Sequence, residues 1–369
     1  MSARGGSASG GKSQLKISYE DVISLENLFT AWREFVPGKK KKNDVVEFSA
    51  RLSDSILQLH AELANFSYVH GGYKAFNISD PKPRNIHKAT VRDRVLHHAI
   101  YRKLYPFFEK VFIADSYSCQ IGKGTHRAIL RLSKFYRQVS KNNRRTVWIL
   151  KCDIKKFFAS IDHKILLEIL ERYIPDKNVL WLLWQIIVSF DFQAEGKGLP
   201  LGNLTSQLFC NVYMNEFDQF VKHRLKAKYY VRYADDFVFL SNDKNWLTQI
   251  VPHIATFLGE RLKLSLHPDK VFIKTLASGV DFLGWIHFPH HRVLRNVTKR
   301  RMFKGLRQRP KNETLQSYLG LISHGDTFKL KQEVLNWYGL LAEKTENQQL
   351  YIHRRFEQSV IVIFIWCII

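Results

Sequence analysis

Two adjacent aspartates, Asp235 and Asp236, lie inside a run of apolar and aromatic residues over 230–240. The flanking residues have the composition of β-strands, so the acidic pair is expected where a hairpin turns. Carboxylates this close repel each other unless a cation neutralises them. The pair therefore indicates a divalent-metal site, and Mg²⁺, which prefers hard oxygen ligands, is the first candidate. An ordinary acidic turn is the alternative, because Asp-Asp pairs are common in turns.

A third carboxylate, Asp153, ends an apolar run over 146–153 that predicts a buried strand. If this strand shares a sheet with the hairpin, the three carboxylates converge. Three carboxylates suffice for two-metal phosphoryl transfer, in which one ion activates an attacking 3′-hydroxyl and the other steadies the leaving pyrophosphate. The sequence therefore predicts two Mg²⁺ ions, with Mn²⁺ as a substitute.

The charge balance of the chain favours a polyanionic partner. Its 369 residues include 57 lysines and arginines against 33 aspartates and glutamates, a formal net charge of +24. Such a surface binds nucleic acid, although ribosome-like or membrane-surface proteins share this composition. The basic residues run through sequence that is predicted to fold, which favours a nucleic-acid channel. The length predicts two or three lobes.

Cysteine usage and the chain ends favour a cytoplasmic protein. The cysteines are scattered without metal-ligand spacing and are interpreted as reduced core thiols, namely Cys119, Cys152, Cys210 and Cys367. The Gly/Ser-rich start lacks the apolar core of a signal peptide. Residues 360–369 are strongly apolar but too few to span a bilayer, so a buried terminal strand or helix end is expected, and no membrane partner.

Hydrophobic periodicity predicts the elements that position these residues. Helices are expected over 18–36, 44–65, 125–139, 163–173, 179–190, 206–225 and 245–262, with a strand-like piece over 270–274. His97 and His98 point in different directions on a predicted helix, so packing is expected rather than metal binding. The loop at 122–124 lacks the spacing of a P-loop, so ATPase chemistry is not expected.

Five segments, in order and spacing, resemble the motifs of reverse transcriptases. They are the first catalytic motif at 153–158, the nucleotide- and template-contacting motif at 198–207, the catalytic motif at 233–236 preceded by Arg232, the lysine motif at 267–270 and the primer grip at 282–285. Arg84, Asp93 with Arg94, and 116–124 resemble the fingers motifs of bacterial enzymes of the group II intron-like lineage. The resemblance covers roughly residues 70–330.

This resemblance implies an α+β right-hand polymerase fold with fingers, palm and thumb, an antiparallel palm sheet and a helical C-terminal thumb. The expected parts are an N-terminal tail and helical extension over 1–69, fingers over 70–145, a palm with the catalytic motifs over 146–289, and a basic helical thumb with an apolar C-terminus over 290–369.

The resemblance also implies roles for individual residues. Asp153 and Asp235 are expected as main metal ligands, Asp236 as a supporting carboxylate and the Ile154 carbonyl as a further ligand. The dNTP-binding residues are expected to be Arg84, Lys123, Ile154, Phe157, Phe158, Leu201, Gly202 and Gln207. The nucleic-acid-binding residues are expected to be Tyr233, Lys270, Leu283, Gly284, Trp285, Arg295, Lys299 and Arg300.

Some of these roles have alternatives. Phe158 is expected to stack under the sugar and exclude a 2′-hydroxyl, the group that distinguishes RNA precursors. Phe157, and less readily Phe158, is alternatively a packed core residue. Arg84 and Lys123 either contact the triphosphate or are plain surface charges.

Two segments depart from the pattern of most relatives. Where these have Gln-Gly followed by Ser-Pro, this chain has Leu201-Gly202 followed by Ser206-Gln207. The exchange resembles reverse transcriptases of diversity-generating retroelements, which misincorporate at template adenines. Leu201 cannot form the hydrogen bonds of a glutamine, so base-pair geometry is expected to be less closely checked. Gln120 replaces an arginine of many relatives, which leaves Lys123 as the expected triphosphate contact.

The resulting prediction is an RNA-directed DNA polymerase of the diversity-generating type. Expected partners are a template or structured non-coding RNA, a primer and cDNA product, dNTPs, and an accessory protein or a second copy of the chain. Basic runs at 39–42 and 295–309 are candidates for contacting the RNA. The alternatives are an antiphage-defence reverse transcriptase, making cDNA from a non-coding RNA or with little templating, and a catalytically silent RNA-binding protein. The intact set of three aspartates argues against the last.

Overall fold

The structure is a computed structural model that describes residues 14–78, 83–192 and 195–340. The chain divides into two units, 1–273 and 274–369, and each is described by itself. The predicted apolar segment 360–369 and Cys367 lie outside the described residues. No helix in the described ranges is long and apolar enough to cross a membrane.

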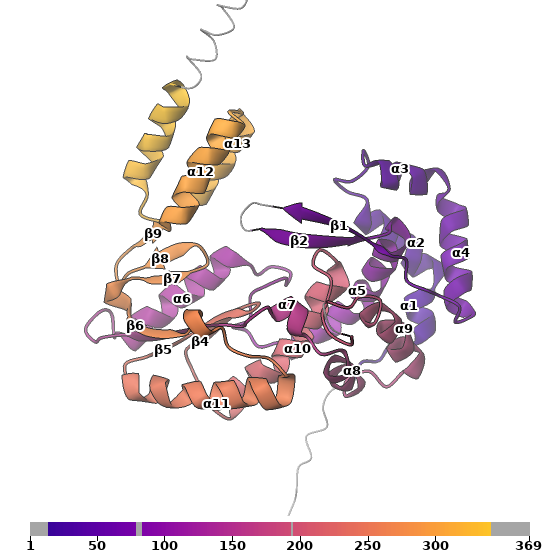
Figure 1. The fold of residues 1–369 in the computed structure, drawn as a ribbon, viewed down its shortest axis with the longest axis horizontal. Helices are drawn as coiled ribbons and strands as arrows, with labels where there is room; N and C mark the ends of the chain where they lie inside the picture. Colours follow the sequence, from indigo (N-terminus) through magenta and orange to yellow (C-terminus); the bar gives the residue numbers. More distant parts are fainter. Residues whose placement is uncertain (1–13, 79–82, 193–194, 341–369) are drawn as a thin grey trace, which may run out of the picture. The chain divides into compact units, whose positions relative to one another are not determined.

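The first unit begins with a layer of helices around a long central helix (Figure 1). These helices are α1 Tyr19–Ile23, α2 Leu25–Phe35, α3 Asn43–Ala50, α4 Leu52–Ala64 and the central α5 Val91–Val111. Ser24 ends α1 and caps α2 by accepting a hydrogen bond from the Asn27 backbone N–H, because serine satisfies the free amides of a helix start. The helix predicted over 18–36 is therefore two helices, and the one predicted over 44–65 is likewise divided at Arg51.

A two-stranded antiparallel hairpin stands between α4 and α5 in the chain. Its strands are β1 Tyr73–Ile78 and β2 Arg84–Ala89, which pair from Tyr73 with Ala89 to Ile78 with Arg84. The side chain of Thr90 then caps α5. Strands β1 and β2 thus form an extended arm, and helices α1 to α5 form its helical base.

The centre of the first unit is a four-stranded sheet in the order β4-β5-β3-β6. The strands are β3 Trp148–Asp153, β4 Tyr230–Tyr233, β5 Asp236–Ser241 and β6 Phe272–Thr275. Strands β3 and β5 are antiparallel neighbours whose interior residues are buried. Buried residues on both faces indicate a sheet covered on both sides.

The remaining helices described in the first unit pack on this sheet or on other helices. They are α6 Thr125–Val139, α7 Phe157–Ser160, α8 His163–Glu171, α9 Lys177–Ile187, α10 Leu204–His223 and α11 Lys244–Leu262, followed by the 3₁₀ turn η1 Pro268–Lys270. Helix α11 lies below the sheet and α6 above it in the view of Figure 1, and both contact β5. Phe217 and Phe220 of α10 pack on Phe257 of α11, with the rings of Phe220 and Phe257 stacked 4.2 Å apart.

The second unit combines a small antiparallel sheet with helices. Its elements are the turn η2 Leu276–Ser278, strands β7 Val280–Phe282, β8 Trp285–His287 and β9 Arg292–Leu294, helices α12 Asn296–Gln308 and α13 Asn312–Ile322, and a further helical segment over 328–340. Trp285, Met302 and Ile322 are among its buried residues. A Cβ on Gly325 would lie 2.1 Å from the Trp285 ring, so only glycine permits this approach.

The predicted α+β class with an antiparallel central sheet is confirmed. Helix α6 has the bounds predicted from its apolar stripe. The four-part division of the chain stays a prediction. One cysteine interpretation is wrong, because Cys119 is exposed while Cys152 and Cys210 are buried; Cys119 lies in a loop with φ +51 rather than in the core.

Candidate active site

The three aspartates of the predicted metal site lie at one end of the central sheet. Asp153, the last residue of β3, is directly opposite Asp236, the first residue of β5. Asp236 also pairs with Tyr233, so Ala234 and Asp235 form a two-residue turn between β4 and β5. Ala234 has φ +55, the left-handed conformation that such tight hairpin turns require. The predicted convergence of strand and hairpin is therefore present in the structure.

Backbone hydrogen bonds fix the neighbourhood of Asp153 from both sides. The Ile154 N–H donates to the Asp235 carbonyl at 3.2 Å, which ties the strand end to the hairpin turn. On the other side, the His267 N–H donates to the Asp153 carbonyl at 2.8 Å. Ile154 also forms a bridge with Leu266. The carboxylates thus stand on backbone that is held by three separate segments.

Two lysines offset part of the negative charge of this cluster. Lys151 Nζ lies 3.0 Å from Asp236 Oδ2, with the two side chains 11% and 21% exposed. Lys270, in the segment that resembles the lysine motif, has its Nζ 2.9 Å from Asp153 Oδ1. Burial raises the pKa of Asp236 to about 6; Asp153 and Asp235 add to this effect and Lys151 opposes it. A cation beside Asp236 therefore favours its charged form.

Lys151 was missed in the sequence, although a signal was present. It stands two residues before Asp153, and side chains at that spacing lie on the same face of a strand. A lysine in an otherwise apolar strand, on the face of a predicted ligand, is the pattern of a buried counter-ion.

The oxygen atoms of the cluster suit a hard divalent cation, which prefers carboxylate and carbonyl ligands. Asp236 Oδ1 is buried and finds no hydrogen-bond partner among the described residues, so it is available as a ligand. The side chains are arranged around the lysines, however, and no group of three His, Cys, Asp or Glu side chains in the described ranges is placed to hold a metal ion. The residues fit such an ion by their chemistry, and their roles as ligands stay a prediction.

The nucleotide-motif loop lies against the arm formed by β1 and β2. The His87 N–H donates to the Leu201 carbonyl, and the Asn203 side chain donates to the His87 carbonyl, both at 2.9 Å. Between them, a Cβ on Gly202 would lie 2.7 Å from Ile86 Cγ2. Three consecutive loop residues therefore contact β2. Asn203 and Ile86 lie beside the predicted site residues Leu201 and Gly202, although neither was itself predicted.

The two phenylalanines after Asp153 have different surroundings. Phe157 is 3% exposed and belongs to the hydrophobic core, whereas Phe158 is partly exposed. Their rings meet edge to face, 5.5 Å apart. Phe158 packs against the same core but is the more exposed ring of this pair, and its stacking under a sugar stays a prediction. Gln207, in the first turn of α10, is also partly exposed.

The residues expected to bind triphosphate are placed differently from each other. Arg84 is exposed at the start of β2. Lys123 Nζ instead donates to the carbonyls of Ile113, Ala114 and Ser116 at 2.8 to 3.3 Å, and burial lowers its pKa. Lys123 thus stabilises its own loop in this structure, and its triphosphate contact stays a prediction.

Tyr233 connects the hairpin to α6. Its hydroxyl accepts a hydrogen bond from Thr125 Oγ1 at 3.4 Å, and its side chain is partly exposed. This leaves Tyr233 accessible beside the carboxylates, as its predicted contact with nucleic acid requires.

The remaining predicted contacts lie in the second unit. Leu283 and Gly284 form the turn between β7 and β8, with φ +53 and +86. Trp285 is 1% exposed, so its ring packs inside the second unit, and its contact with nucleic acid stays a prediction. Arg295 pairs with Asp281 at 2.6 Å and Lys299 with Glu333 at 2.7 Å, whereas Arg300 is exposed.

An antiparallel sheet that brings carboxylates from a strand end and a hairpin turn together is the palm of a right-hand polymerase. Residues 78–287 match the family model described as reverse transcriptase (RNA-dependent DNA polymerase). The chain therefore belongs to the reverse transcriptase family, and this confirms the family that its motifs predicted.

Relatives of the chain include group II intron-encoded proteins. Protein YkfC of Escherichia coli is 27% identical over 258 residues, which cover 60% of this chain and 66% of YkfC. The group II intron-encoded protein LtrA of Lactococcus lactis is 22% identical over 342 residues, covering 74% of this chain and 54% of LtrA. The chain thus spans about two thirds or less of each relative. A telomerase structure from Candida tropicalis aligns with a TM-score of 0.47 at 13% identity, covering 62% of this chain and 55% of that one.

Proposed function

We propose that the chain is an RNA-directed DNA polymerase that adds dNTPs to a primer 3′-hydroxyl. The observation that carries this proposal is the pairing of Asp153 with Asp236 across β3 and β5, with Asp235 on the adjoining turn. Membership of the reverse transcriptase family supports it. The proposed partners are a template RNA, the primer and cDNA product, and an accessory protein or a second copy of the chain.

In this proposal Asp153 and Asp235 would be the main ligands of two Mg²⁺ ions, and Asp236 and the Ile154 carbonyl would be further ligands. Such ions activate the hydroxyl and offset phosphate charge. The chain itself supplies the positioning. Lys151 favours the charged form of Asp236 against the effect of burial on its pKa, and Phe158 forms the floor under the sugar.

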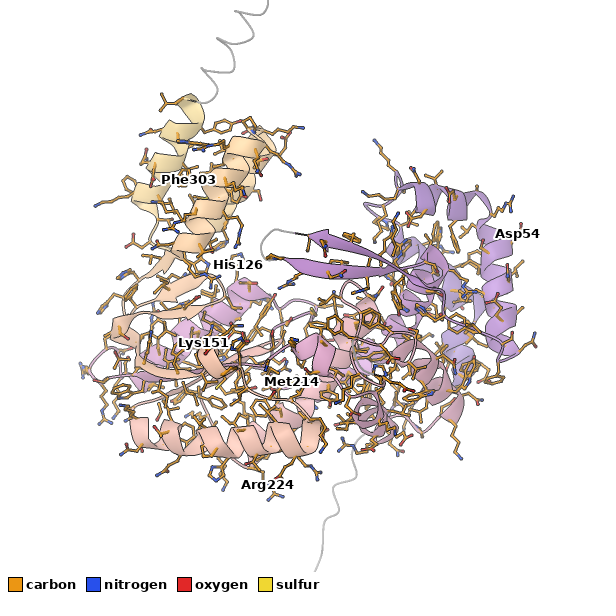
Figure 2. All side chains as sticks on the ribbon, viewed as in Figure 1. Asp54, His126, Lys151, Met214, Arg224 and Phe303 are labelled. Carbon is orange, nitrogen blue, oxygen red and sulfur yellow. The ribbon has the colours of Figure 1, made fainter. Side chains whose placement is uncertain are left out.

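Primer extension on an RNA template with Mg²⁺ tests this function. Wild type is expected to extend the primer, and Asp235→Asn and Asp236→Asn are expected to lose at least about a hundredfold in rate, because each removes charge from the reacting centre. Asp54→Asn is the matched control, since Asp54 is exposed on α4, far along the chain from the sheet (Figure 2). Absence of wild-type synthesis on every RNA and DNA template, with either Mg²⁺ or Mn²⁺, would contradict the proposal.

We further propose that the polymerase copies a dedicated RNA of a diversity-generating retroelement with errors at adenines. Leu201 supports this, because its carbonyl is taken by His87 and its side chain has no hydrogen-bonding group to offer a nucleotide. Sequencing the products should show errors concentrated at template adenines and a weaker bias in Leu201→Gln. Errors spread evenly over the four template bases would refute the bias. A gene neighbourhood without a template and variable repeat pair would favour the defence role instead.

A further inference from the structure

Arg232, the residue before the catalytic motif, is completely buried. Its guanidinium forms a two-pronged ion pair with Asp218 of α10, with Nε to Oδ1 at 2.8 Å and Nη2 to Oδ2 at 2.6 Å. Both side chains are 0% exposed. Tyr230 adds a hydrogen bond from its hydroxyl to Asp218 Oδ1 at 2.8 Å. Because a buried ion pair gives little net stability over apolar packing, its presence here calls for another explanation.

The free edge of the guanidinium contacts the catalytic turn. Arg232 Nη1 donates to the Ala234 carbonyl at 3.1 Å. Ala234 has φ +55, a conformation that is disfavoured for residues with a Cβ and persists only where surrounding contacts hold it. The next carbonyl, that of Asp235, accepts from the Ile154 N–H. The two carbonyls of the turn are therefore both held, one by Arg232 and one by the end of β3.

The same guanidinium reaches the loop that carries Lys123. Nη2 donates to Ser116 Oγ at 2.9 Å, and the Ser116 hydroxyl also accepts from Gln120 Nε2 at 2.9 Å. The backbones are joined as well, since the Arg232 N–H donates to the Asp115 carbonyl at 3.0 Å. One side chain thus connects the nucleotide-motif helix α10, the fingers loop and the turn bearing Asp235.

We propose that Arg232 and Asp218 are positioning residues, which fix the catalytic turn through the Ala234 carbonyl and link it to the fingers loop through Ser116. The proposal rests on the proposed polymerase function for its catalytic consequence. Neither residue touches substrate in this scheme. Both act by keeping the Asp235 carboxylate where the reaction needs it, and misplacement of a reacting group by about 1 Å costs roughly a hundredfold in rate.

Arg232→Lys separates positioning from charge. A lysine keeps the positive charge for Asp218, but its single nitrogen cannot reproduce the planar fork that serves Asp218, Ser116 and Ala234 together. In single-nucleotide incorporation, kcat is expected to fall about ten- to a hundredfold while KM for the dNTP stays within about threefold. Template–primer affinity, measured by fluorescence anisotropy, is expected to match wild type.

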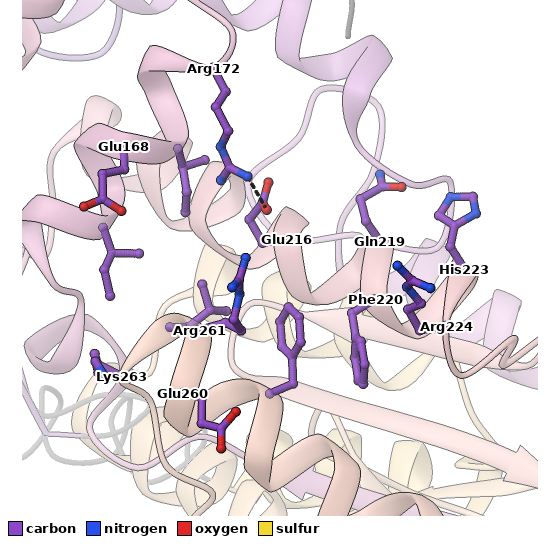
Figure 3. Close-up of a pocket in the computed structure, with 14 residues that line it drawn as sticks. Glu168, Arg172, Glu216, Gln219, Phe220, His223, Arg224, Glu260, Arg261 and Lys263 are labelled. Atoms are coloured by element: carbon purple, nitrogen blue, oxygen red, sulfur yellow. Dashed lines mark hydrogen bonds and ion pairs between the residues drawn. The ribbon is translucent and has the colours of Figure 1, made fainter. Parts of the chain in front are cut away.

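Arg172→Lys is the matched control. Arg172, the residue that follows α8, pairs at 3.0 Å with Glu216 of α10, two residues from Asp218. Figure 3 shows this pair. The same substitution there alters an ion pair to the same helix, one whose side chains are 40% and 19% exposed, without touching the turn. A kcat for Arg232→Lys no lower than for Arg172→Lys, or a loss confined to KM or template affinity, overturns the proposal.

Two further measurements keep the inference separate from protein stability and from the polymerase function. Ser116→Ala removes one hydrogen bond of the guanidinium, together with the bond that Ser116 accepts from Gln120. It is expected to lower kcat about threefold even if Arg232→Lys fails to fold, and an unchanged kcat in that variant refutes the link to the fingers loop. Hydrogen–deuterium exchange over 230–237 is expected to be faster in Arg232→Lys, or in Ser116→Ala if the lysine variant is unfolded, than in Arg172→Lys. An inactive wild type with this exchange difference contradicts the function alone, and unchanged exchange contradicts the positioning role.

Discussion

At the scale of single residues, Gly202 sets the distance between the nucleotide-motif loop and the arm. Its φ of +106 is one that other residues rarely adopt, and Ile86 occupies the space where a Cβ would project. Because Leu201 and Asn203 are hydrogen-bonded to His87 on either side, the loop cannot move away without losing both bonds. A methyl group at this position therefore meets both backbone strain and a steric clash.

Gly202→Ala is expected to lower the free energy of unfolding by about 1–3 kcal/mol and to slow primer extension. Gly196→Ala is the control, since Gly196 has φ +73 but an added Cβ there meets nothing within 4 Å in the described part of the chain. The excess loss at Gly202 measures the clash together with the additional strain of an alanine at φ +106 compared with +73. Ile86→Ala in the Gly202→Ala background should recover part of that excess. Urea unfolding measures the free energy of unfolding of each variant. Equal losses at the two glycines would show that the clash is relieved without cost.

The residues of the candidate site differ in how well the neighbouring sequence predicts them. Asp153, Asp235 and Asp236 could be predicted because each lies at or beside an end of a strand-like run, and the register then places Asp153 opposite Asp236. Asp218 could not be predicted, because nothing in α10 reveals that its partner is Arg232, fourteen positions further along. Lys151 is an intermediate case. Its place two residues before Asp153 is a local signal, but it is informative only once the face of the strand that carries Asp153 is known.

At the scale of elements, the arm is attached to its helical base by a buried polar cluster. Asp93 of α5 accepts hydrogen bonds from the Tyr68 hydroxyl at 2.9 Å and the Gly71 N–H at 3.0 Å. His97, one turn later, lies with its Nε2 3.2 Å from that of His70, and the two rings stack. His97 is 1% exposed, which confirms the expected packing role. Burial lowers the pKa of His97 to about 3, with His70 adding to the effect and Asp93 opposing it.

This cluster predicts a loss of stability on mild acidification. Below about pH 6.5 the unfolded chain binds a proton at His97 that the folded chain refuses until about pH 3, so stability is full above pH 6.5 and falls as the pH drops through this window. The slope is about 1.4 kcal/mol per pH unit for one group, or roughly 2 kcal/mol between pH 7 and pH 5. The His97→Gln variant should therefore lose roughly 2 kcal/mol less of its free energy of unfolding than wild type between pH 7 and pH 5.

Urea unfolding at pH 7 and pH 5 measures the difference. His253→Gln serves as the control, since His253 is exposed on α11. Equal pH dependence in wild type and His97→Gln would show that the folded protein accommodates a charged His97.

Elements were predictable where one face of the chain is apolar. Helix α6 follows its stripe from Thr125 to Val139, and Asp162 caps α8 as its type and place suggest, accepting from two backbone amides at 3.1 Å. The break at Ser24 was not predicted, because the apolar stripe continues through it and only the capping bond to Asn27 ends one helix and begins the next. Contacts between loop and strand, such as Leu201 with His87, depend on tertiary structure and leave no periodic pattern.

At the scale of the whole molecule, the net charge of +24 suits a polyanionic partner such as the proposed template and primer. A polymerase must move along its template, so contacts to phosphates, which are the same at every step, suit it better than contacts to particular bases. Phosphate contacts release counterions, and the affinity they provide falls steeply with salt. Among the predicted contacts of α12, Arg295 and Lys299 are ion-paired within the second unit, whereas Arg300 is exposed.

Arg300→Ala is therefore expected to weaken template–primer binding and to reduce the slope of log affinity against log salt by about one, the share of a single phosphate contact. Lys177→Ala, which removes an exposed charge from the start of α9, should leave the slope unchanged. Fluorescence anisotropy between about 50 and 200 mM salt spans the range over which such contacts differ most. If the two variants have equal slopes, general charge attracts the template and α12 makes no contact of its own. If only Arg300→Ala differs, the basic face of α12 follows the nucleic-acid backbone.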